Sequence, residues 1–266
     1  MRWMLFVTVL LGACGSHAPH APDNIADLMP YFFQNWETGQ TETIAEAAVN
    51  LANAATVVTI GHPMKAELDA LPAAAIASLG LKDHDPSSTA GLIIVNIFKC
   101  NLPQLEKILI DTDQSGIYPG NYDAYSRTYT SSRDDYLARK VPNLTWSAGL
   151  TSTNLVTMSE TLIGGMRYVP DQGGGKSPWG PALVQRTYLP SQAVFDGTDN
   201  YWRQDYQIEV YMEIEPNRIL HAYATWRELH VTDMFVSGGA FYTSKSLDNM
   251  VSWDQSTEDA CAAGKE

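Results

Sequence analysis

The sequence is short of cysteine, of positive charge and of long apolar runs. Three cysteines in 266 residues are too few for a disulfide-rich scaffold. Lys and Arg total 17 against 30 Asp and Glu, a net charge of −13, which argues against tight binding to nucleic acid. No stretch approaches the roughly 20 apolar residues of a transmembrane helix. With 45% apolar residues, we expect a globular protein.

Familiar catalytic motifs are also missing. The sequence contains no Gly-x-Ser-x-Gly, Ser-x-x-Lys or His-Glu-x-x-His motif, which serine nucleophiles and many zinc enzymes require. Glu209, Glu213 and Glu215 share one strand parity and are predicted to lie on a solvated sheet face, unlike the paired acids of a glycosidase cleft. We therefore expect no catalytic residue, no metal and no cofactor.

The first residues have the pattern of an export signal. Arg2 supplies positive charge, residues 3–11 form a short apolar run, and Leu11-Gly12-Ala13-Cys14 comes next, so residues 1–13 are predicted to be a signal peptide. The Leu-Gly-Ala-Cys run resembles the lipobox of bacterial lipoproteins, which implies cleavage before Cys14 and lipidation of its sulfur. Gly15 in place of Asp resembles lipoproteins that are sorted to the outer membrane. The alternative is an ordinary secretory signal with an incidental cysteine.

An exported chain would carry its remaining cysteines into an oxidising compartment. The lipid anchor predicts a location in the cell envelope, with the outer membrane favoured over the inner membrane. Residues 14–23 are predicted to be a flexible tether between the lipid and the folded domain. In such a compartment Cys100 and Cys261 are predicted to form a disulfide. Two buried free thiols are the alternative.

Residues 24–90 are predicted to form an N-terminal helical cap. Apolar residues at positions 44, 47, 48, 51, 52 and 55 have helical spacing, which predicts a helix over 41–56 that Thr43 and Glu46 would close as a capping box. Pro63, Pro72 and Pro86 interrupt the rest of the cap, so we expect a short second helix and a loop there.

The remainder, residues 91–266, is predicted to be an α+β domain. The apolar run 91–99 predicts a strand, and Asn101 is the N-cap of the next helix. A closing helix is expected over about 246–262. Alternation between them predicts strands near 123–131, 135–141, 144–150, 154–169, 182–190, 203–215 and 218–230.

This order of elements resembles the helix-grip fold of START-like (SRPBCC) proteins. The resemblance implies a curved antiparallel sheet packed on the C-terminal helix, with an apolar ligand held between them. A lipocalin-like or jelly-roll sheet would also have many strands, but neither accounts as well for the opening strand and helix and the closing helix.

The last predicted hairpin supplies the candidate site residues. If Glu215 pairs with Arg218, strand alternation places one set of side chains on the apolar face toward the ligand, namely Tyr206, Met212, His221, Tyr223 and Arg227. A slip of one residue would instead turn His221 and Arg227 out to solvent. The alternative is a purely structural role, in which Arg227 forms an ion pair with an acid and His221 is a sheet residue whose hydrogen bonds are made within the protein.

The sequence thus predicts a lipid-anchored envelope protein that binds an apolar or amphipathic, lipid-like ligand. The alternative is a non-catalytic surface scaffold that docks an envelope protein through its acidic face. An enzyme of unknown class ranks third.

Overall fold

The structure is a computed structural model that describes residues 20–152, 157–171, 180–232 and 239–264. The predicted signal peptide, Cys14 and the first part of the tether lie outside the described residues.

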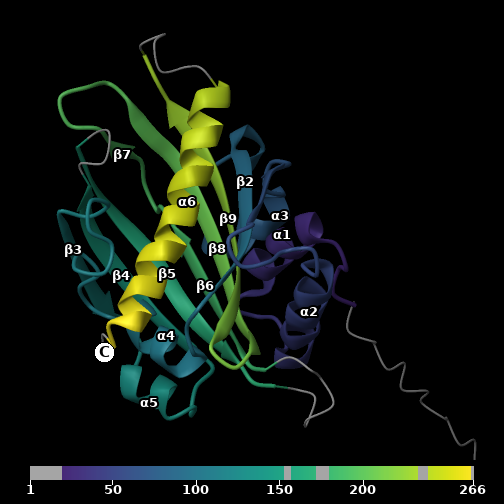
Figure 1. The fold of residues 1–266 in the computed structure, drawn as a ribbon. Coiled ribbons are helices and arrows are strands. Elements are labelled where there is room, and N and C mark those ends of the chain that lie inside the picture. The colour runs from purple at the N-terminus through teal and green to yellow at the C-terminus, as the bar shows by residue number, and fades with distance from the viewer. Residues whose placement is uncertain (1–19, 153–156, 172–179, 233–238, 265–266) are drawn as a thin grey trace, which may run out of the picture.

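The described chain is built on one antiparallel sheet in the order β1-β2-β9-β8-β6-β5-β4-β3, with β7 paired to β8. The sheet is curved and strongly twisted (Figure 1). The strands are β1 Met64–Leu68, β2 Ala90–Phe98, β3 Ala124–Tyr129, β4 Asn143–Ser152, β5 Met158–Val169, β6 Ala182–Tyr188, β7 Ala193–Val194, β8 Tyr201–Glu215 and β9 Arg218–His230.

Helices cover both faces of this sheet. The helices α1 Ile25–Asn35, α2 Thr41–Ala54 and α3 Ala73–Ile76 pack on one face, and the long helix α6 Gly239–Ala262 crosses the other (Figure 1). The shorter helices are α4 Leu102–Leu109, α5 Arg133–Leu137 and the 3-10 turns Ala77–Leu79 and Pro86–Ser88. The predicted fold class is confirmed: an α+β fold with a curved antiparallel sheet, a C-terminal helix and an N-terminal helical cap.

The central strands of the sheet define two opposite ends. We call one the hairpin end, where β8 ends at Glu215 and β9 begins at Arg218; β2 and β5 also end there. The other is the distal end, where β8 begins at Tyr201 and β9 ends at His230.

Local signals in the sequence predict most helices correctly. Asn101 caps α4, since its side chain accepts a hydrogen bond from the Gln104 backbone N–H at 2.9 Å. Helix α2 starts at Thr41 as predicted, but its N-cap is Gln40 and the Thr43 hydroxyl donates to the Gln40 carbonyl at 2.9 Å. The predicted capping box is therefore wrong.

Two segments differ in type from their predictions. The strand predicted at 135–141 is replaced by helix α5, where Ser132 accepts a hydrogen bond from the Asp135 backbone N–H, because local capping outweighs a short alternation. The segment after α2 contains the expected short helix, α3, but it also contributes the unpredicted strand β1, which pairs with β2 along its full length. The C-terminal helix is longer than predicted and begins at Gly239.

Trp36 fixes the helical cap to the sheet. Its indole N–H donates to the Val184 carbonyl at 2.8 Å, and its ring lies over Gly165, where an added Cβ would sit 2.3 Å from the ring. Arg167 donates to the Trp36 carbonyl at 2.8 Å. The cap is thus fixed by shape and by buried hydrogen bonds as well as by apolar contact.

Candidate functional site

The register of the β8–β9 hairpin decides which side chains face α6. Glu215 pairs with Arg218 as predicted, but a bulge between Glu213 and Glu215 shifts the following pairs, as far as Gln204 and Glu228, by one residue. An extra residue on one strand of a pair moves all the partners beyond it. As a result Tyr211, rather than Met212, lies opposite His221.

The predicted ligand-lining residues are therefore divided between two faces. Tyr206 and Met212 lie beneath the helical cap, where Tyr206 packs edge-on against Phe33 at 5.8 Å. His221, Tyr223 and Arg227 lie on the face beneath α6. The prediction that all five share one face is wrong, and so is the alternative that a slip exposes His221, because α6 covers that face and His221 is fully buried.

The face beneath α6 is rich in polar side chains from β8 and β9. Glu209, predicted to lie in solvent with Glu213 and Glu215, is buried because α6 covers the face on which it lies. By strand alternation the set on this face is Asp205, Gln207, Glu209 and Tyr211 from β8, and His221, Tyr223, Thr225 and Arg227 from β9.

His221 fastens α6 to the sheet. Its Nδ1 lies 2.6 Å from Asp254 Oδ1 on α6, and Asn96 of β2 donates to Asp254 Oδ2 at 2.9 Å. Its Nε2 lies 3.4 Å from Glu209 Oε2, and its ring stacks on Tyr211 at 4.1 Å. Burial by itself lowers the pKa of His221, but the Asp254 and Glu209 carboxylates outweigh it and raise that pKa to about 9. The imidazolium is thus held between two acids.

Tyr223 and Arg227 are paired with neighbouring side chains. Arg227 Nε donates to Asp205 Oδ2 at 2.9 Å, and Tyr223 donates through its hydroxyl to Gln207 Oε1 at 3.0 Å. Thr225 also donates to Asp205, at 3.3 Å. The alternative in which Arg227 pairs with an acid is therefore the one that the structure supports.

Glu160 of β5 is the functional candidate that the sequence analysis missed. Strand pairing places it beside Leu150 of β4, on the face beneath α6. Its Oε2 is buried and has no hydrogen-bond partner among the described residues. Burial, together with the nearby Asp205 charge, raises the pKa of Glu160 to about 7 against the opposing effect of Arg227. A carboxyl group in this state can exchange its proton near neutral pH.

Apolar side chains lie beside Glu160 on the same part of the sheet. We call them the distal cluster: Leu150, Leu162, Leu189 and Ala193, with the partly buried rings of Tyr122, Tyr125 and Trp202 packed against them. A separate apolar group, Leu92, Ile94, Tyr223, Leu247 and Met250, joins α6 to β2 and β9. The polar strip around Asp205 lies between these two apolar groups, a combination typical of sites for amphipathic molecules.

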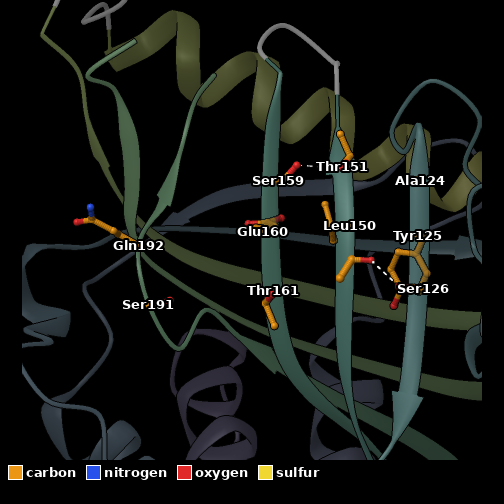
Figure 2. Close-up of a pocket in the computed structure, with 11 residues that line it drawn as sticks. Ala124, Tyr125, Ser126, Leu150, Thr151, Ser159, Glu160, Thr161, Ser191 and Gln192 are labelled. Atoms are coloured by element: carbon orange, nitrogen blue, oxygen red, sulfur yellow. Dashed lines mark hydrogen bonds between the residues drawn. The ribbon is translucent and has the colours of Figure 1, made fainter. Parts of the chain in front are cut away.

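A hollow of about 570 Å³ opens over β3, β4 and β5 near Glu160 (Figure 2). Its lining includes Tyr125, Leu150 and Glu160. It also includes a row of small and hydroxyl residues, which strand alternation places on the opposite face of the same strands: Ala124, Ser126, Gly149, Thr151, Ser159 and Thr161. Ser191 and Gln192 close one side. Most of this lining therefore lies on the sheet face opposite the one that carries the Glu160 side chain.

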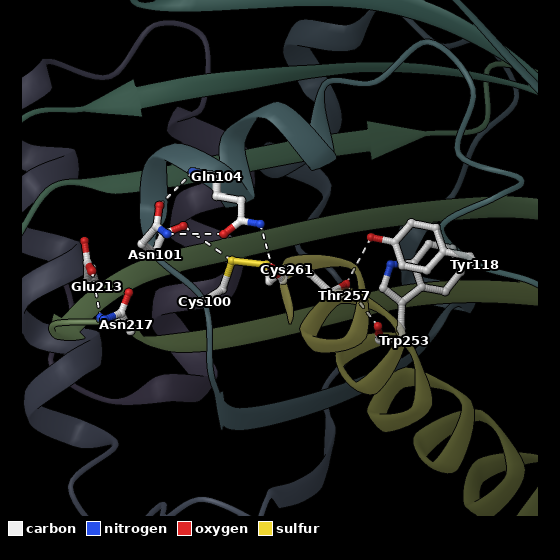
Figure 3. Close-up of a disulfide and its surroundings, with 9 residues drawn as sticks. All are labelled: Cys100, Asn101, Gln104, Tyr118, Glu213, Asn217, Trp253, Thr257 and Cys261. Carbon is white, nitrogen blue, oxygen red and sulfur yellow. Dashed lines mark hydrogen bonds between the residues drawn. A yellow bond between two sulfur atoms is a disulfide. The ribbon is translucent and has the colours of Figure 1, made fainter. Parts of the chain in front are cut away.

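The predicted disulfide Cys100–Cys261 is present and closes the other end of the α6 interface (Figure 3). Gln104 donates to the Cys261 carbonyl at 2.7 Å. One and two turns earlier on α6, Thr257 meets the Tyr118 hydroxyl at 3.1 Å and Trp253 stacks on the Tyr118 ring at 4.1 Å. The C-terminal half of α6 is thus fixed at the hairpin end of the sheet.

The described residues contain no group of three or more His, Cys, Asp or Glu that could hold a metal ion. Within the same residues, no helix is both long and apolar enough to cross a membrane.

Comparison with known proteins gives likeness of fold only. No protein-family model matches the sequence, and no curated protein matches it. Among solved structures, a START superfamily protein from Mycobacterium smegmatis is similar over 65% of this chain and 97% of its own, at 7% identity and a TM-score of 0.42. A STAR-related lipid transfer protein from Xanthomonas axonopodis covers 70% and 92%, at 9% identity and a TM-score of 0.38. Human StAR-related lipid transfer protein 5 covers 85% and 98%, at 7% identity and a TM-score of 0.39. At this level of similarity we assign no function from these structures, and the site must be interpreted from its own residues.

Proposed function

We propose that this protein is a lipid-anchored cell-envelope protein that binds an amphipathic, lipid-like ligand at the distal cluster, with the head group of the ligand at Glu160. The observation that carries the proposal is the buried Oε2 of Glu160, which lacks a hydrogen-bond partner among the described residues. Leaving a buried polar group unpaired costs roughly 1–3 kcal/mol. A ligand that pairs with it would recover that free energy.

The charges around Glu160 select the type of head group. Arg227 is already paired with Asp205, so its charge is largely neutralised for an incoming anion. With its pKa near 7, Glu160 carries a proton below neutral pH and can donate it in a hydrogen bond to a hydroxyl or carbonyl oxygen. The site therefore favours an uncharged, oxygen-bearing head group over a carboxylate or phosphate.

The distal cluster supplies the apolar part of the site. Its leucines and aromatic rings lie on the same face as Glu160 or border it, and burial of a methylene group there is worth about 0.8 kcal/mol. Tyr223 and Arg227 from the predicted set lie on this face, whereas His221 lies further toward the hairpin end and holds α6 in place. We assign His221 a positioning role and the other two a place at the edge of the site.

The anchor is proposed from the sequence, because Leu11-Gly12-Ala13-Cys14 resembles a lipobox. The membrane would then be one partner of the protein, and the outer membrane is the favoured location. Expression of the full chain in a Gram-negative host tests this directly. The wild-type protein should fractionate with membranes and the Cys14→Ser protein should not.

Native mass spectrometry of the soluble form, Gly15–Glu266, tests ligand binding. After incubation with extracted envelope lipids, we expect a mass adduct at pH 6 that is weaker at pH 8. Glu160→Gln should retain the adduct at both values, because its amide can donate the same hydrogen bond without titrating. Thr161→Val, one residue away on the opposite face, should behave like the wild type. A bare mass under all conditions would refute ligand binding and favour the scaffold alternative.

A further inference from the structure

Among the residues that the structure describes, large apolar side chains are exposed mainly at one end of the sheet. Among the described residues those most exposed are Val57 at 80%, Val194 at 45%, Ile60 and Leu137 at 40%, and Val141 at 36%. Exposed apolar residues scattered singly need no explanation, but a group on one side indicates an interaction surface. Four of these five lie at the hairpin end.

Val57 and Ile60 belong to the loop between α2 and β1. Ile60 lines a hollow of about 310 Å³ between the C-terminal end of α2 and the β8–β9 hairpin. The apolar walls of this hollow include Ile97 and Leu220, and Glu215 and Arg218 also line it. The loop therefore extends an apolar hollow with exposed aliphatic side chains.

Leu137 and Val141 reach the same end from another direction. Leu137 is the last residue of α5, and Val141 comes two residues before β4 begins at Asn143, which pairs with Arg167 near the end of β5. In Figure 1, α5 lies at the same lower end as the C-terminus of α6. Val194 pairs with Tyr201 at the start of β8, about 45 Å from the hairpin turn at 3.3 Å per residue.

The described chain begins close to this surface. His20 Nδ1 lies 3.0 Å from Glu46 Oε1 on α2, and Asn50 donates to the Pro22 carbonyl at 2.9 Å. From Glu46 the axis of α2 covers about 14 Å before it reaches Ala55 at the hollow, at 1.5 Å per residue. The six residue steps from Cys14 to His20 span about 22 Å at most. A lipid on Cys14 would hold α2 and the hairpin end near the bilayer.

We propose that the hairpin end is a membrane-facing surface, in which Val57, Ile60, Leu137 and Val141 enter the interfacial layer of the bilayer that holds the anchor. The inference rests on the proposed lipidation of Cys14. The proposal adds an orientation of the protein on the membrane, in which the hairpin end faces the lipid and the distal end, near Glu160, points away from it.

Two exposed cations at this end are paired with acids, which fits an uncharged lipid surface. Arg218 pairs with Glu215 at 2.7 Å and Lys140 with Asp135 at 2.9 Å, so each of these two exposed cations has an acid beside it. Apolar contact, rather than attraction to anionic lipids, would hold the surface in place.

Hydrogen exchange on a chemically anchored protein tests the proposal. The chain Cys14–Glu266 would be coupled through Cys14 to a maleimide lipid in phosphatidylcholine vesicles, with Cys100 and Cys261 protected by their disulfide. We expect amide exchange in residues 56–62 and 137–142 to slow about threefold or more on coupling, while residues 193–195 exchange as before. Because the anchor is attached chemically, the result does not depend on whether cells lipidate Cys14.

Matched variants separate membrane contact from other causes. The double variant Val57→Ser, Ile60→Ser should lose the slowed exchange in 56–62, whereas Val194→Ser should keep it, and both should unfold at the wild-type temperature. Unchanged exchange in 56–62 on coupling would overturn the proposal. So would the same slowing in concentrated protein without vesicles, because a second copy of the chain would then cover this surface.

Discussion

Replacement of Glu160 by glutamine should stabilise the protein, and the gain should grow as the pH rises from 4.5 to about 7. The buried carboxyl group has its pKa raised from 4.5 to about 7. Below pH 4.5 the group is protonated in both the folded and the unfolded chain, so it contributes no difference. As the pH rises from 4.5 to 7, the unfolded chain has lost this proton while the folded chain still holds it, so the free energy of unfolding falls over that range and levels off above it.

The size of the effect can be worked out from the pKa. At 1.36 kcal/mol per pH unit, a rise from 4.5 to about 7 corresponds to about 3 kcal/mol at pH 8. The residue is partly exposed, so water will reduce this, and we expect a gain of about 1–3 kcal/mol for Glu160→Gln at pH 8.

Urea unfolding of the soluble form Gly15–Glu266 at pH 4, 6 and 8 measures this gain. Glu67→Gln, which changes an exposed carboxylate on β1, is the matched control and should show no such trend. Equal stability of wild type and Glu160→Gln at pH 8 would refute the assignment of a costly buried carboxyl group at this position.

Three further predictions concern how the two layers of helices are held to the sheet. Cys261→Ser removes a cross-link between residues 161 apart, for which the chain-entropy model gives about 5 kcal/mol; urea unfolding should show a large loss, and an unchanged midpoint would exclude that role. The pKa of His221 is near 9 because of its pairing with Asp254 and Glu209. The His221–Asp254 pair therefore contributes stability that is fully present below pH 6.5 and is lost as the pH rises through 9. Asp254→Asn should flatten that decline in stability, and a decline that persists in this variant would contradict the pairing. Gly165→Ala would place a Cβ 2.3 Å from the Trp36 ring and should cost about 1–3 kcal/mol in thermal unfolding; a wild-type transition temperature would show that the ring can move aside.

Much of the fold could be predicted because the local sequence patterns agree with the pairing and packing that the elements have in the structure. The alternation in β8, the apolar run of β2 and the Asn101 cap each specify one element. Where a short alternation competed with a capping serine, as at Ser132 before α5, the helix formed instead. Strand β1 was missed because its five residues are stabilised by pairing with β2 rather than by a pattern of their own.

The site could be predicted only in part, because one bulge shifts the pairing of all five predicted site residues. Glu215 and Arg218 pair as expected, and yet the bulge places His221 opposite Tyr211. Nothing in the residue types near Ile214 requires that bulge. The alternation within β5 could have identified Glu160. Glu160, Leu162 and Met166 point to the same face of the sheet because they are separated by even numbers of residues. Leu162 and Met166 are buried, which places Glu160 on the face beneath α6.

The central claim is that a protonated Glu160 receives the uncharged head group of an amphipathic ligand. The most direct test is a titration of monoolein, an uncharged single-chain glyceride, into the soluble form at pH 6 and pH 8. With a pKa near 7, the protonated fraction falls about tenfold between these values, so the affinity of the wild type should fall about tenfold. Glu160→Gln should bind equally at both. Absence of binding at pH 6, or the same fall in affinity in Glu160→Gln, would contradict the claim.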